Sequence, residues 1–305
     1  MSATQPRHAV RTPLAVRIAT PIGVLVTALA SLFTLWGEFE PTPVPPAPAA
    51  AMALPSVARD AETARNPCGD AEVKAALAAG DDAATIAAFG GGEQFRAAIA
   101  AGNAPCIALD DPQRVWVVVN KLRPLEPADY APTSLGRIGL QATSRSTGLR
   151  AEAVAALDRM AADARSAGAG VLGVNNGYRS FGVQQTTYAS HVRARGQEGA
   201  DAGSARPGHS EHQTGLAVDV IACSPACGGL DEFGDTPQGR WVAENAWRYG
   251  FIVRYEQGET GTTGYLAEPW HLRYIGPELA AAYQQGGYRT LEAFFGLPAA
   301  PDYGH

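Results

Sequence analysis

The stretch SEHQTGLAVDVIA, residues 210–222, places a carboxylate inside a run of large apolar residues. Val218 and Val220 flank Asp219 and indicate a buried β-strand, because short apolar runs of this kind are typical of strands. An ionised carboxylate in such a place has to be hydrogen-bonded, ion-paired or bound to a cation. His212 lies seven residues before Asp219, so the stretch has two interpretations, a structural aspartate or a pair of metal ligands.

A second segment, EPWHLRYI (268–275), contains His271 at the start of another expected strand. With His212 and Asp219 it completes a set of two histidines and one carboxylate, which is a three-ligand zinc shell with the fourth position left for water. Zinc lowers the pKa of its bound water to about 7, and a neighbouring carboxylate can accept the proton. Glu268 is the remaining acid of this segment, so the two segments together predict a zinc hydrolase with Glu268 as general base.

The remaining histidines are poor ligand candidates. His8 and His305 lie at the two ends of the chain. His191 is expected on a solvated helix face beside two arginines, and His209 in a loop.

Helical and strand patterns alternate around these segments, and the connections are too short for several parallel crossovers. Ser180 is a suitable N-cap for one helix, and Thr236 followed by Pro237 starts another. The sequence therefore predicts an α+β fold in which helices pack on a small, mainly antiparallel sheet. The expected elements are strands at 114–120, 171–176, 216–222, 251–255 and 270–275, helices at 150–168, 177–192 and 237–248, a last helix that starts at a proline, and a polar loop at 196–209.

Ahead of this domain, which is expected at 108–298, the chain is rich in alanine, glycine and proline. Residues 37–66 predict an extended Pro/Ala linker that is too poor in large side chains to pack. Residues 67–107 contain short alanine-rich helical patterns that end in glycine. They predict a small helical unit, which is either a stapled spacer or cap on the main domain or a cell-wall contact module.

The N-terminal segment has the features of a membrane anchor. Residues 18–36, IATPIGVLVTALASLFTLW, carry no charge, and an α-helix needs about 20 such residues to cross the hydrocarbon layer. Arginines precede the segment and acids follow it, which predicts a cytoplasmic tail at 1–17. A cleaved signal peptide is the alternative, because APAAAMA at 47–53 offers small residues. Both export the rest of the chain, and the anchor predicts a single-pass protein of the cell membrane with an extracytoplasmic catalytic domain.

The charge balance argues against a nucleic-acid partner. The chain of 305 residues has a formal net charge of −6 and a pI near 5.5, and no run of lysine or arginine stands out. Nucleic-acid binding would need a basic patch or stripe.

The cysteines agree with export, because disulfides persist outside the cytoplasm. Three pairings of Cys68, Cys106, Cys223 and Cys227 are possible. We expect Cys68–Cys106 and Cys223–Cys227, because each pair brackets one local segment, and in the loop-entropy treatment they contribute about 4 and about 2 kcal/mol. The second pair would close a small loop near the rim of the site. A zinc site made from all four is the alternative, although their spacing is not that of a zinc ribbon or finger.

Three blocks in this order resemble the VanY-type zinc D,D-carboxypeptidases: GYRSFGVQQTTY (177–188), GHSEHQTGLAVDV (208–220) and EPWHLRYIG (268–276). The loop at 118–135 also resembles the start of their catalytic domain. The resemblance covers roughly residues 115–277 and does not reach the N-terminal segments.

The resemblance implies a role for each matching position. Glu268 would be the general base, and Arg179 would stabilise the carbonyl oxygen as it becomes negative. Ser210 would bind the free C-terminal carboxylate of the peptide, and Gln184 would contact the substrate. The positions that would hold Zn²⁺ are His212, Asp219 and His271.

The family substrate is the peptidoglycan stem peptide ending in D-Ala-D-Ala, from which the last D-alanine is removed. The resemblance therefore implies a cell-wall hydrolase in which a zinc-bound water attacks the terminal amide and Glu268 hands a proton to the leaving amine. An endopeptidase of a related zinc fold is the alternative among enzymes. A non-catalytic wall-binding protein is the alternative outside enzymes, but it predicts loss of a ligand or of the base, and all four positions are filled.

Overall fold

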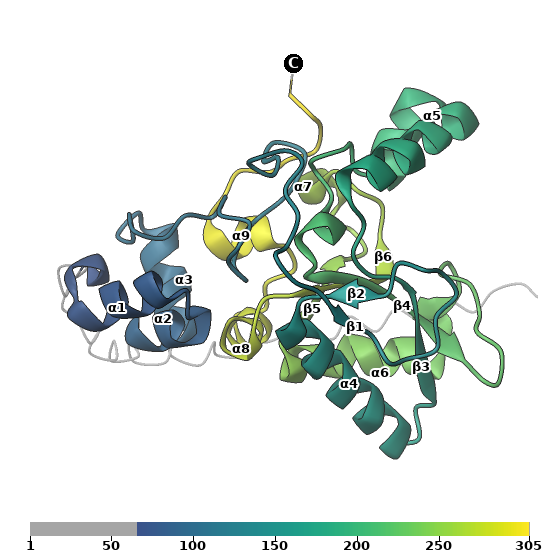
Figure 1. Ribbon diagram of the computed structural model, residues 1–305, viewed down its shortest axis with the longest axis horizontal. Coiled ribbons are helices and arrows are strands. Elements are labelled where there is room, and N and C mark those ends of the chain that lie inside the picture. The colour runs from purple at the N-terminus through teal and green to yellow at the C-terminus, as the bar shows by residue number, and fades with distance from the viewer. Residues whose placement is uncertain (1–65, 305) are drawn as a thin grey trace, which may run out of the picture. The chain divides into compact units, whose positions relative to one another are not determined.

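The computed structural model describes residues 66–304, which Figure 1 shows in colour. The predicted cytoplasmic tail, the predicted anchor at 18–36 and all but the last residue of the predicted linker lie outside the described residues. None of the helices within 66–304 has the length and apolar character needed to cross a membrane.

Helices and short strands alternate along the described chain. The α-helices are α1 (Ala71–Ala79), α2 (Asp82–Ala88), α3 (Gly92–Ala100), α4 (Ala151–Ser166), α5 (Phe181–Gly203), α6 (Pro237–Asn245), α7 (Thr260–Thr263), α8 (Pro277–Gln285) and α9 (Leu291–Phe295). The strands are β1 (Gly136–Arg137), β2 (Gly148–Leu149), β3 (Val171–Asn176), β4 (Ala217–Cys223), β5 (Phe251–Tyr255) and β6 (Glu268–Tyr274). The 3₁₀ helices are η1 (Pro67–Gly69), η2 (Glu211–Thr214), η3 (Phe233–Asp235) and η4 (Ala246–Tyr249).

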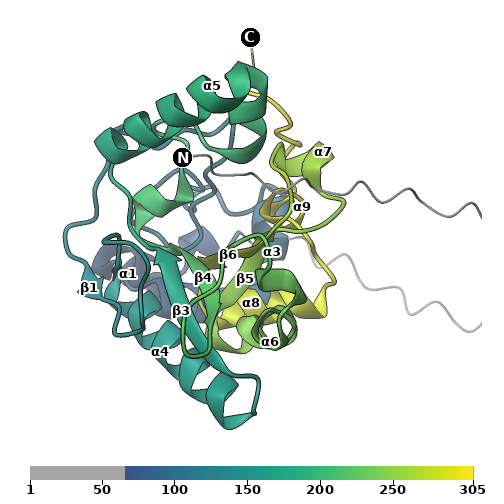
Figure 2. The ribbon, with the colours of Figure 1, turned by 90° about the vertical axis from the view of Figure 1, so that its right-hand side faces the viewer.

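The central sheet has the strand order β3-β4-β6-β5, and all three pairings are antiparallel. This confirms the predicted class of helices packed on a small, mainly antiparallel sheet. Helices α4, α6 and α8 cover one face of the sheet, and α5 lies on the other side (Figures 1 and 2). The region between the sheet and α5 holds the candidate site.

Alternation along β4 separates the core from the site. Val218 and Val220 are fully buried in the hydrophobic core. Asp219 points to the opposite face, because successive side chains of a strand alternate. In the β4–β6 pairing Asp219 lies directly opposite His271. Directly paired residues share one face of the sheet, so the register places these two side chains together.

Residues 115–120 are buried, but the segment 114–120 does not form the predicted strand. Side chains satisfy part of their backbone instead: Nη2 of Arg273 donates to the carbonyl oxygens of Val115 and Val117 at 3.1 and 2.7 Å. Buried carbonyl groups need a partner, and a neighbouring strand is only one way to provide it. The apolar run correctly predicted burial, whereas the strand prediction was wrong because an arginine takes the place of the partner strand.

Helix α5 is longer than predicted. It continues to Gly203, through a segment for which the sequence predicts a polar loop. Gly196 interrupts the helix with φ 74° and ψ 175°, and the chain then resumes a helical path. Glycine adopts a positive φ at little cost, so the residue that suggested a loop produces a kink inside a longer helix.

The predicted helical unit at 67–107 contains α1, α2 and α3 and the expected Cys68–Cys106 disulfide. Helix α3 packs against α8 and α9 of the main domain. Gly92 permits this close approach, because a Cβ there would collide with the carbonyl oxygen of Glu278. The unit therefore packs on the main domain as a cap.

The second expected disulfide, Cys223–Cys227, closes a loop at the end of β4. All four cysteines are thus paired, and none is free. This excludes the alternative of a zinc site made from the cysteines.

Candidate metal centre

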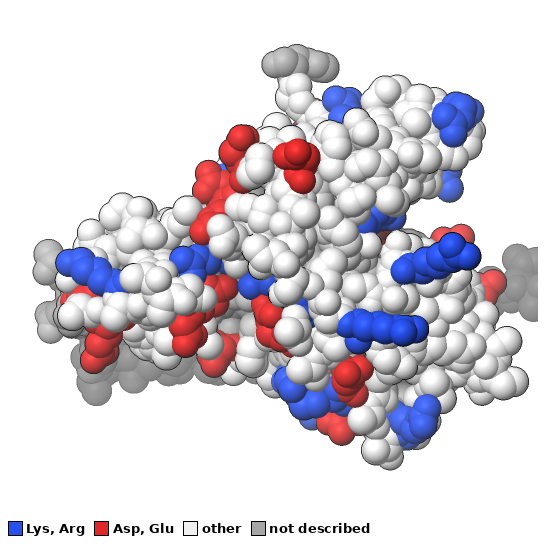
Figure 3. All heavy atoms as spheres, viewed as in Figure 1, with Lys and Arg blue, Asp and Glu red and all other residues white. Residues whose placement is uncertain are grey.

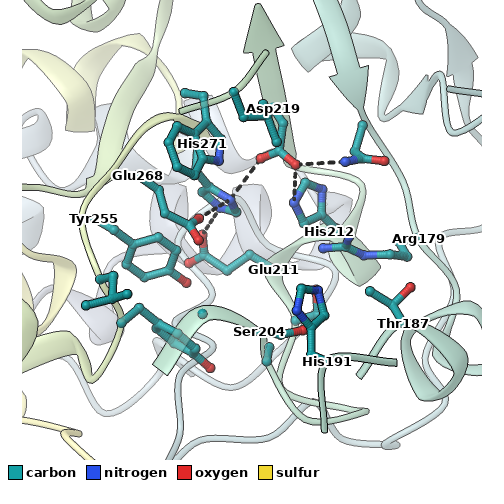
Figure 4. Close-up of a pocket in the computed structure, with 18 of the residues that line it drawn as sticks. Arg179, Thr187, His191, Ser204, Glu211, His212, Asp219, Tyr255, Glu268 and His271 are labelled. Carbon is teal, nitrogen blue, oxygen red and sulfur yellow. Dashed lines mark hydrogen bonds and ion pairs between the residues drawn. The ribbon is translucent and has the colours of Figure 1, made fainter. Parts of the chain in front are cut away.

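Three buried side chains converge at the face of the sheet that is turned toward α5 (Figure 4). His212 comes from η2, Asp219 from β4 and His271 from β6. Nε2 of His212 lies 3.4 Å from Oδ2 of Asp219, and Nδ1 of His271 lies 3.2 Å from Oδ1 of the same carboxylate. One ligand atom from each side chain lies within 4.8 Å of the other two. The structure therefore brings the three expected ligands to one point.

Hydrogen bonds fix which ring nitrogen of each histidine faces the centre. Nδ1 of His212 lies 2.8 Å from the carbonyl oxygen of Gly177, so it donates there and Nε2 is left as the acceptor. Nε2 of His271 lies 3.3 Å from Oε2 of Glu211, which leaves Nδ1 toward Asp219. Hydrogen bonds of this kind orient metal-binding histidines in proteins and set their tautomer.

The donor set fits a divalent metal ion. Oδ1 of Asp219 is buried without a hydrogen-bond partner, and an ionised carboxylate oxygen in that position calls for a cation. Oδ2 of the same group accepts a hydrogen bond from Nδ2 of Asn176 at 3.1 Å. Two imidazole nitrogens and one carboxylate oxygen form the protein shell of catalytic zinc sites, which keep a fourth position open.

The pKa shifts of the three candidate ligands bear on how they would bind a cation. Burial alone would raise the pKa of Asp219, but His212 and His271 hold it well below its usual value. Burial lowers the pKa of His212. Burial also acts to lower the pKa of His271, yet the carboxylates of Asp219 and Glu211 raise it to about 9. A cation that binds here therefore displaces a proton from His271 and meets a carboxylate that is already ionised.

Glu268 borders the centre without belonging to the set of three ligands. Its Oε2 lies 3.6 Å from Nδ1 of His271. Burial raises the pKa of the Glu268 carboxyl to about 7, although the charge of His271 acts in the opposite direction. A carboxyl group whose pKa lies near the operating pH can both accept and return a proton.

The centre lies in the wall of a cleft of about 600 Å³, which Arg179 and Ser210 also line. Nε of Arg179 is buried without a hydrogen-bond partner. Burial lowers the pKa of Arg179, and the nearby charges of Asp219 and Glu268 counteract this shift. Ser210 is 2% exposed, and its hydroxyl makes no hydrogen bond with another residue of 66–304. Both side chains can therefore donate to a ligand in the cleft.

Two residues of α5 lie elsewhere than the sequence indicated. Gln184, expected to contact the substrate, is fully buried and does not line the cleft. Its Nε2 donates to the carbonyl oxygen of Ala205 at 2.6 Å, so it positions the turn behind the cleft wall. His191, expected on a solvated face, lines the cleft (Figure 4). Helical periodicity separates the two faces of α5 but does not show which face meets a cleft.

Sequence reasoning also missed a group of buried charges beside the centre, which we call the arginine–glutamate cluster. Nε of Arg254 and Nη1 of Arg273 both lie 2.9 Å from Oε1 of Glu211. Nη2 of Arg254 lies 2.8 Å from Oε1 of a second glutamate, Glu292. All four side chains are fully buried. The sequence does carry a signal for this cluster: each arginine lies inside an apolar strand segment, FIVRY or WHLRYI, where a buried charge would need a carboxylate partner.

Comparisons with known proteins agree on one family. Residues 146–277 match the family model described as VanY, D-alanyl-D-alanine carboxypeptidase. The chain is similar to YodJ of Bacillus subtilis (strain 168), described as a putative carboxypeptidase, with 36% identity over 191 residues that cover 61% of this chain and 69% of the relative. It is similar to a D-alanyl-D-alanine carboxypeptidase of Enterococcus faecium, with 37% identity over 135 residues that cover 44% of this chain and 40% of the relative.

Among solved structures, the chain is similar to that of the LdcB LD-carboxypeptidase, with a TM-score of 0.56 and 36% identity. The similarity covers 61% of this chain and 87% of the LdcB chain. The region that matches the family model contains the three candidate ligands, Glu268 and Arg179, and it begins after the helical unit.

Proposed function

We propose, because this chain belongs to the VanY family of D-alanyl-D-alanine carboxypeptidases, that it removes the terminal D-alanine from peptidoglycan stem peptides ending in D-Ala-D-Ala. The chain is a zinc-dependent peptidase. The observation that carries the finer proposal is the position of Glu268, a buried acid with a raised pKa that is not one of the three ligands, beside the converging metal donors.

Zinc is the cofactor that the donors fit. Nε2 of His212, Oδ1 of Asp219 and Nδ1 of His271 would hold it, since these atoms converge and their neighbours leave them available. When bound, zinc lowers the pKa of a water ligand to about 7 and polarises the peptide carbonyl group.

Glu268 moves the proton of the reaction. Oε2 of Glu268 accepts a proton from the attacking water and afterwards gives it to the amide nitrogen that leaves. A pKa of about 7 suits both steps near neutral pH. The approach of Oε2 to His271, at 3.6 Å, supports a position beside the reacting carbonyl carbon.

Arg179 stabilises the negative charge that develops on the carbonyl oxygen. Its Nε lacks a protein partner although it is buried at the cleft. A donor that is held in place before the reaction needs no reorganisation when charge develops, which is the basis of an oxyanion hole.

Ser210 binds the free carboxylate of the terminal D-alanine. Its hydroxyl lines the cleft and has no hydrogen-bond partner within the part of the chain that the structure describes. A carboxylate accepts hydrogen bonds only, and a hydroxyl without another partner is a suitable donor to it.

A second candidate is removal of D-alanine from a peptide in which an L-configured residue precedes the cut bond. The similarity to the LdcB LD-carboxypeptidase favours it, because that chain is covered to 87% at 36% identity. Both reactions would use the same metal donors and the same base. They differ in the configuration of the residue that precedes the cut bond.

We also propose that the catalytic domain works outside the cytoplasm and is held at the membrane by the N-terminal segment. The two disulfides support an oxidising location, and the uncharged run at 18–36 supports an anchor. The test is fractionation of cells that express the full chain, with protease added to spheroplasts. A membrane-bound chain that protease degrades supports the proposal. A shorter chain in the soluble fraction indicates a cleaved signal peptide, and protection from protease would overturn the location.

The reaction is tested with the zinc-loaded full-length chain and two peptides, read by mass spectrometry. One is a stem pentapeptide ending in D-Ala-D-Ala, and the other is the tetrapeptide that ends in an L-diamino acid and D-alanine. Loss of one alanine from the pentapeptide, abolished by a chelator and restored by zinc, is the expected result. Loss from the tetrapeptide alone establishes the second candidate. A cut inside either peptide indicates an endopeptidase, and zinc binding without any cut indicates a wall-binding protein.

A further inference from the structure

One face of α5 forms a wall of the cleft beyond the metal centre. Val183, Thr187, His191 and Arg195 follow one another at intervals of four residues and all line the cleft. Residues four apart lie on the same side of a helix. Figure 4 shows Thr187 and His191 across the cleft from Glu268. We call these four residues the α5 wall; they line the same cleft as the metal centre.

The basic groups of the α5 wall have no partner in the protein. The side chains of His191 and Arg195 make no hydrogen bond or ion pair with any residue of 66–304. Arg206, which follows the same helix, is different: its Nη2 lies 2.9 Å from Oδ2 of Asp201, and its guanidinium stacks on Tyr303. The arginine outside the cleft is paired, whereas the arginine inside the cleft is available to a ligand.

The kink in α5 places the end of the Arg195 side chain. After Gly196 the chain turns back, so that a Cβ on Gly203 would lie 3.4 Å from Nη1 of Arg195. Gly203 and the next two residues line the cleft as well. The guanidinium therefore lies at the rim of the cleft over the Gly203 backbone.

No ion pair joins the α5 wall to an acid that lines the cleft. Asp219 faces the two histidines, Glu211 is paired with arginines, and Glu268 lies beside His271. Asp231 is the other acid that lines the cleft. Figure 3 shows basic side chains projecting from the outer end of α5, which contains arginine but no lysine. Burial, together with Arg195 and Arg179, lowers the pKa of His191, so at neutral pH the imidazole is uncharged and Arg195 carries the charge of the wall.

Apolar surface lies on the same cleft. Val183 is 48% exposed and Leu266 is 56% exposed, and both line the cleft. Exposed large apolar side chains inside a cleft favour a ligand with aliphatic parts. The cleft thus combines apolar contacts with an unpaired guanidinium, which is complementary to a carboxylate on an aliphatic stem.

We propose that the α5 wall is a binding site for a second carboxylate of the substrate, on a residue upstream of the cut bond, and that Arg195 is the residue that binds it. The inference rests on the proposed function, because it assumes a peptide whose C-terminal end occupies the metal centre. A stem peptide carries such a group in two places, the α-carboxylate of its γ-linked D-glutamate and, in one class of wall, the carboxylate at the end of the third side chain. Arginine binds a carboxylate through two parallel N–H donors, and amidation of the carboxylate removes the charge and one acceptor.

The test measures binding rather than turnover. The full-length, zinc-loaded Glu268→Gln variant is titrated calorimetrically with three stem pentapeptides: one with both carboxylates free, one amidated at the glutamate and one amidated at the third side chain. A charged hydrogen-bonded contact contributes about 10-fold or more in affinity. We expect amidation at one of the two places to raise Kd about 10-fold. The peptide whose Kd rises identifies which carboxylate is bound.

Arg195→Gln, introduced into the same background, should remove the discrimination between the free and the amidated peptide. Arg193→Gln is the matched control, because Arg193 is an exposed arginine of the same helix that does not line the cleft. It changes the net charge by the same amount and should leave the discrimination intact. Circular dichroism checks that both variants keep the fold.

Equal Kd values for all three peptides would overturn the inference, whether or not the wild type cuts them. If Arg195→Gln and Arg193→Gln reduced the discrimination between free and amidated peptides equally, the inference would also be overturned, since long-range charge would then explain the effect. Discrimination by Arg195 without any hydrolysis by the wild type would support the carboxylate site and overturn the proposed reaction.

Discussion

The metal centre and the arginine–glutamate cluster are neighbours that share one hydrogen bond, from His271 to Glu211. In the cluster, each arginine faces a carboxylate, and none of its side-chain nitrogens or oxygens is buried without a partner. In the centre and its cleft, Oδ1 of Asp219 and Nε of Arg179 are buried with no hydrogen-bond partner. Both regions bury charge beside the same sheet, but only the centre and its cleft retain buried polar atoms without a hydrogen-bond partner.

This difference identifies which of the two regions has a function. A satisfied network of buried charges needs nothing further and serves as structure. Buried polar atoms without a partner are costly and are rare in native proteins, so each needs an explanation. The proposed function supplies an explanation for two of them: a cation at Asp219 and a substrate oxygen at Arg179. The cluster, in turn, holds His271 in the orientation that the centre needs.

The largest effect is expected from removing a donor of the centre. His212→Ala should abolish stoichiometric zinc in the purified protein and reduce hydrolysis to background, because two protein ligands do not make a zinc shell. Metal content is measured by mass spectrometry of the protein dialysed against trace zinc. His209→Ala is the control, since His209 bonds to the carbonyl oxygen of Asn120 and lies outside the ligand set. Retained zinc in His212→Ala would refute the ligand set.

The next effect concerns the base and should separate metal binding from chemistry. Glu268→Gln should keep zinc and lower kcat by about 100- to 10,000-fold, the usual range for loss of general acid–base catalysis. Asp231→Asn is the control, because Asp231 is an exposed acid that lines the same cleft. Steady-state hydrolysis and metal analysis are performed on the same samples. Turnover of Glu268→Gln near that of the control would remove Glu268 from the mechanism.

A change in the cluster should affect stability more than chemistry. Glu211→Gln leaves Arg273 without a carboxylate and Arg254 with one, and breaking a buried ion pair costs about 3–5 kcal/mol. Urea denaturation is measured with chelator present, so that metal binding does not contribute to the free energy of unfolding. Glu244→Gln is the control, as Glu244 is exposed and has no ion pair among the described residues. Equal stability of the two variants would show that the cluster is not the structural counterpart of the centre.

The smallest effect is the pH dependence of the stability that Glu292 of the cluster contributes. Burial acts to raise the pKa of Glu292, but Arg254 and Asn120 hold it below its usual value. A carboxyl group with a lower pKa in the folded state stabilises fully above its unfolded pKa and loses that contribution as the pH falls through the folded value. We therefore expect the difference in unfolding free energy between wild type and Glu292→Gln to shrink below about pH 4. Denaturation at a series of pH values measures it, and a constant difference from neutral to acidic pH would contradict the expectation.

The candidate ligands were predictable from the sequence because they are polar or charged residues within or beside apolar strand patterns. A carboxylate between Val218 and Val220 has to be explained by a partner, and His212 and His271 lie in short segments that also carry strand patterns. The antiparallel class followed from short connections between strands, and Ser180 correctly marked the start of α5, where its hydroxyl accepts from the Val183 amide. These inferences use local features only.

The features that escaped prediction depend on partners far away in the chain. Arg273 bonds to carbonyl groups of Val115 and Val117, which lie 158 and 156 residues earlier. No local pattern shows that an arginine will replace a strand there. Likewise, the arrangement of His191 toward the cleft depends on the tertiary position of α5 over the sheet. Composition and periodicity describe one segment of the chain. These two features depend on contacts between segments that are distant in the sequence.

The register of β4 against β6 has a practical consequence. Asp219 and His271 face each other only because the two strands pair at this offset, and a slip of one residue would turn one of them to the opposite side of the sheet. A misaligned chain could still be compact, but it would have no place for the ion. The zinc-to-protein ratio of a preparation is therefore a count of correctly assembled molecules, and it can be read before any substrate is chosen.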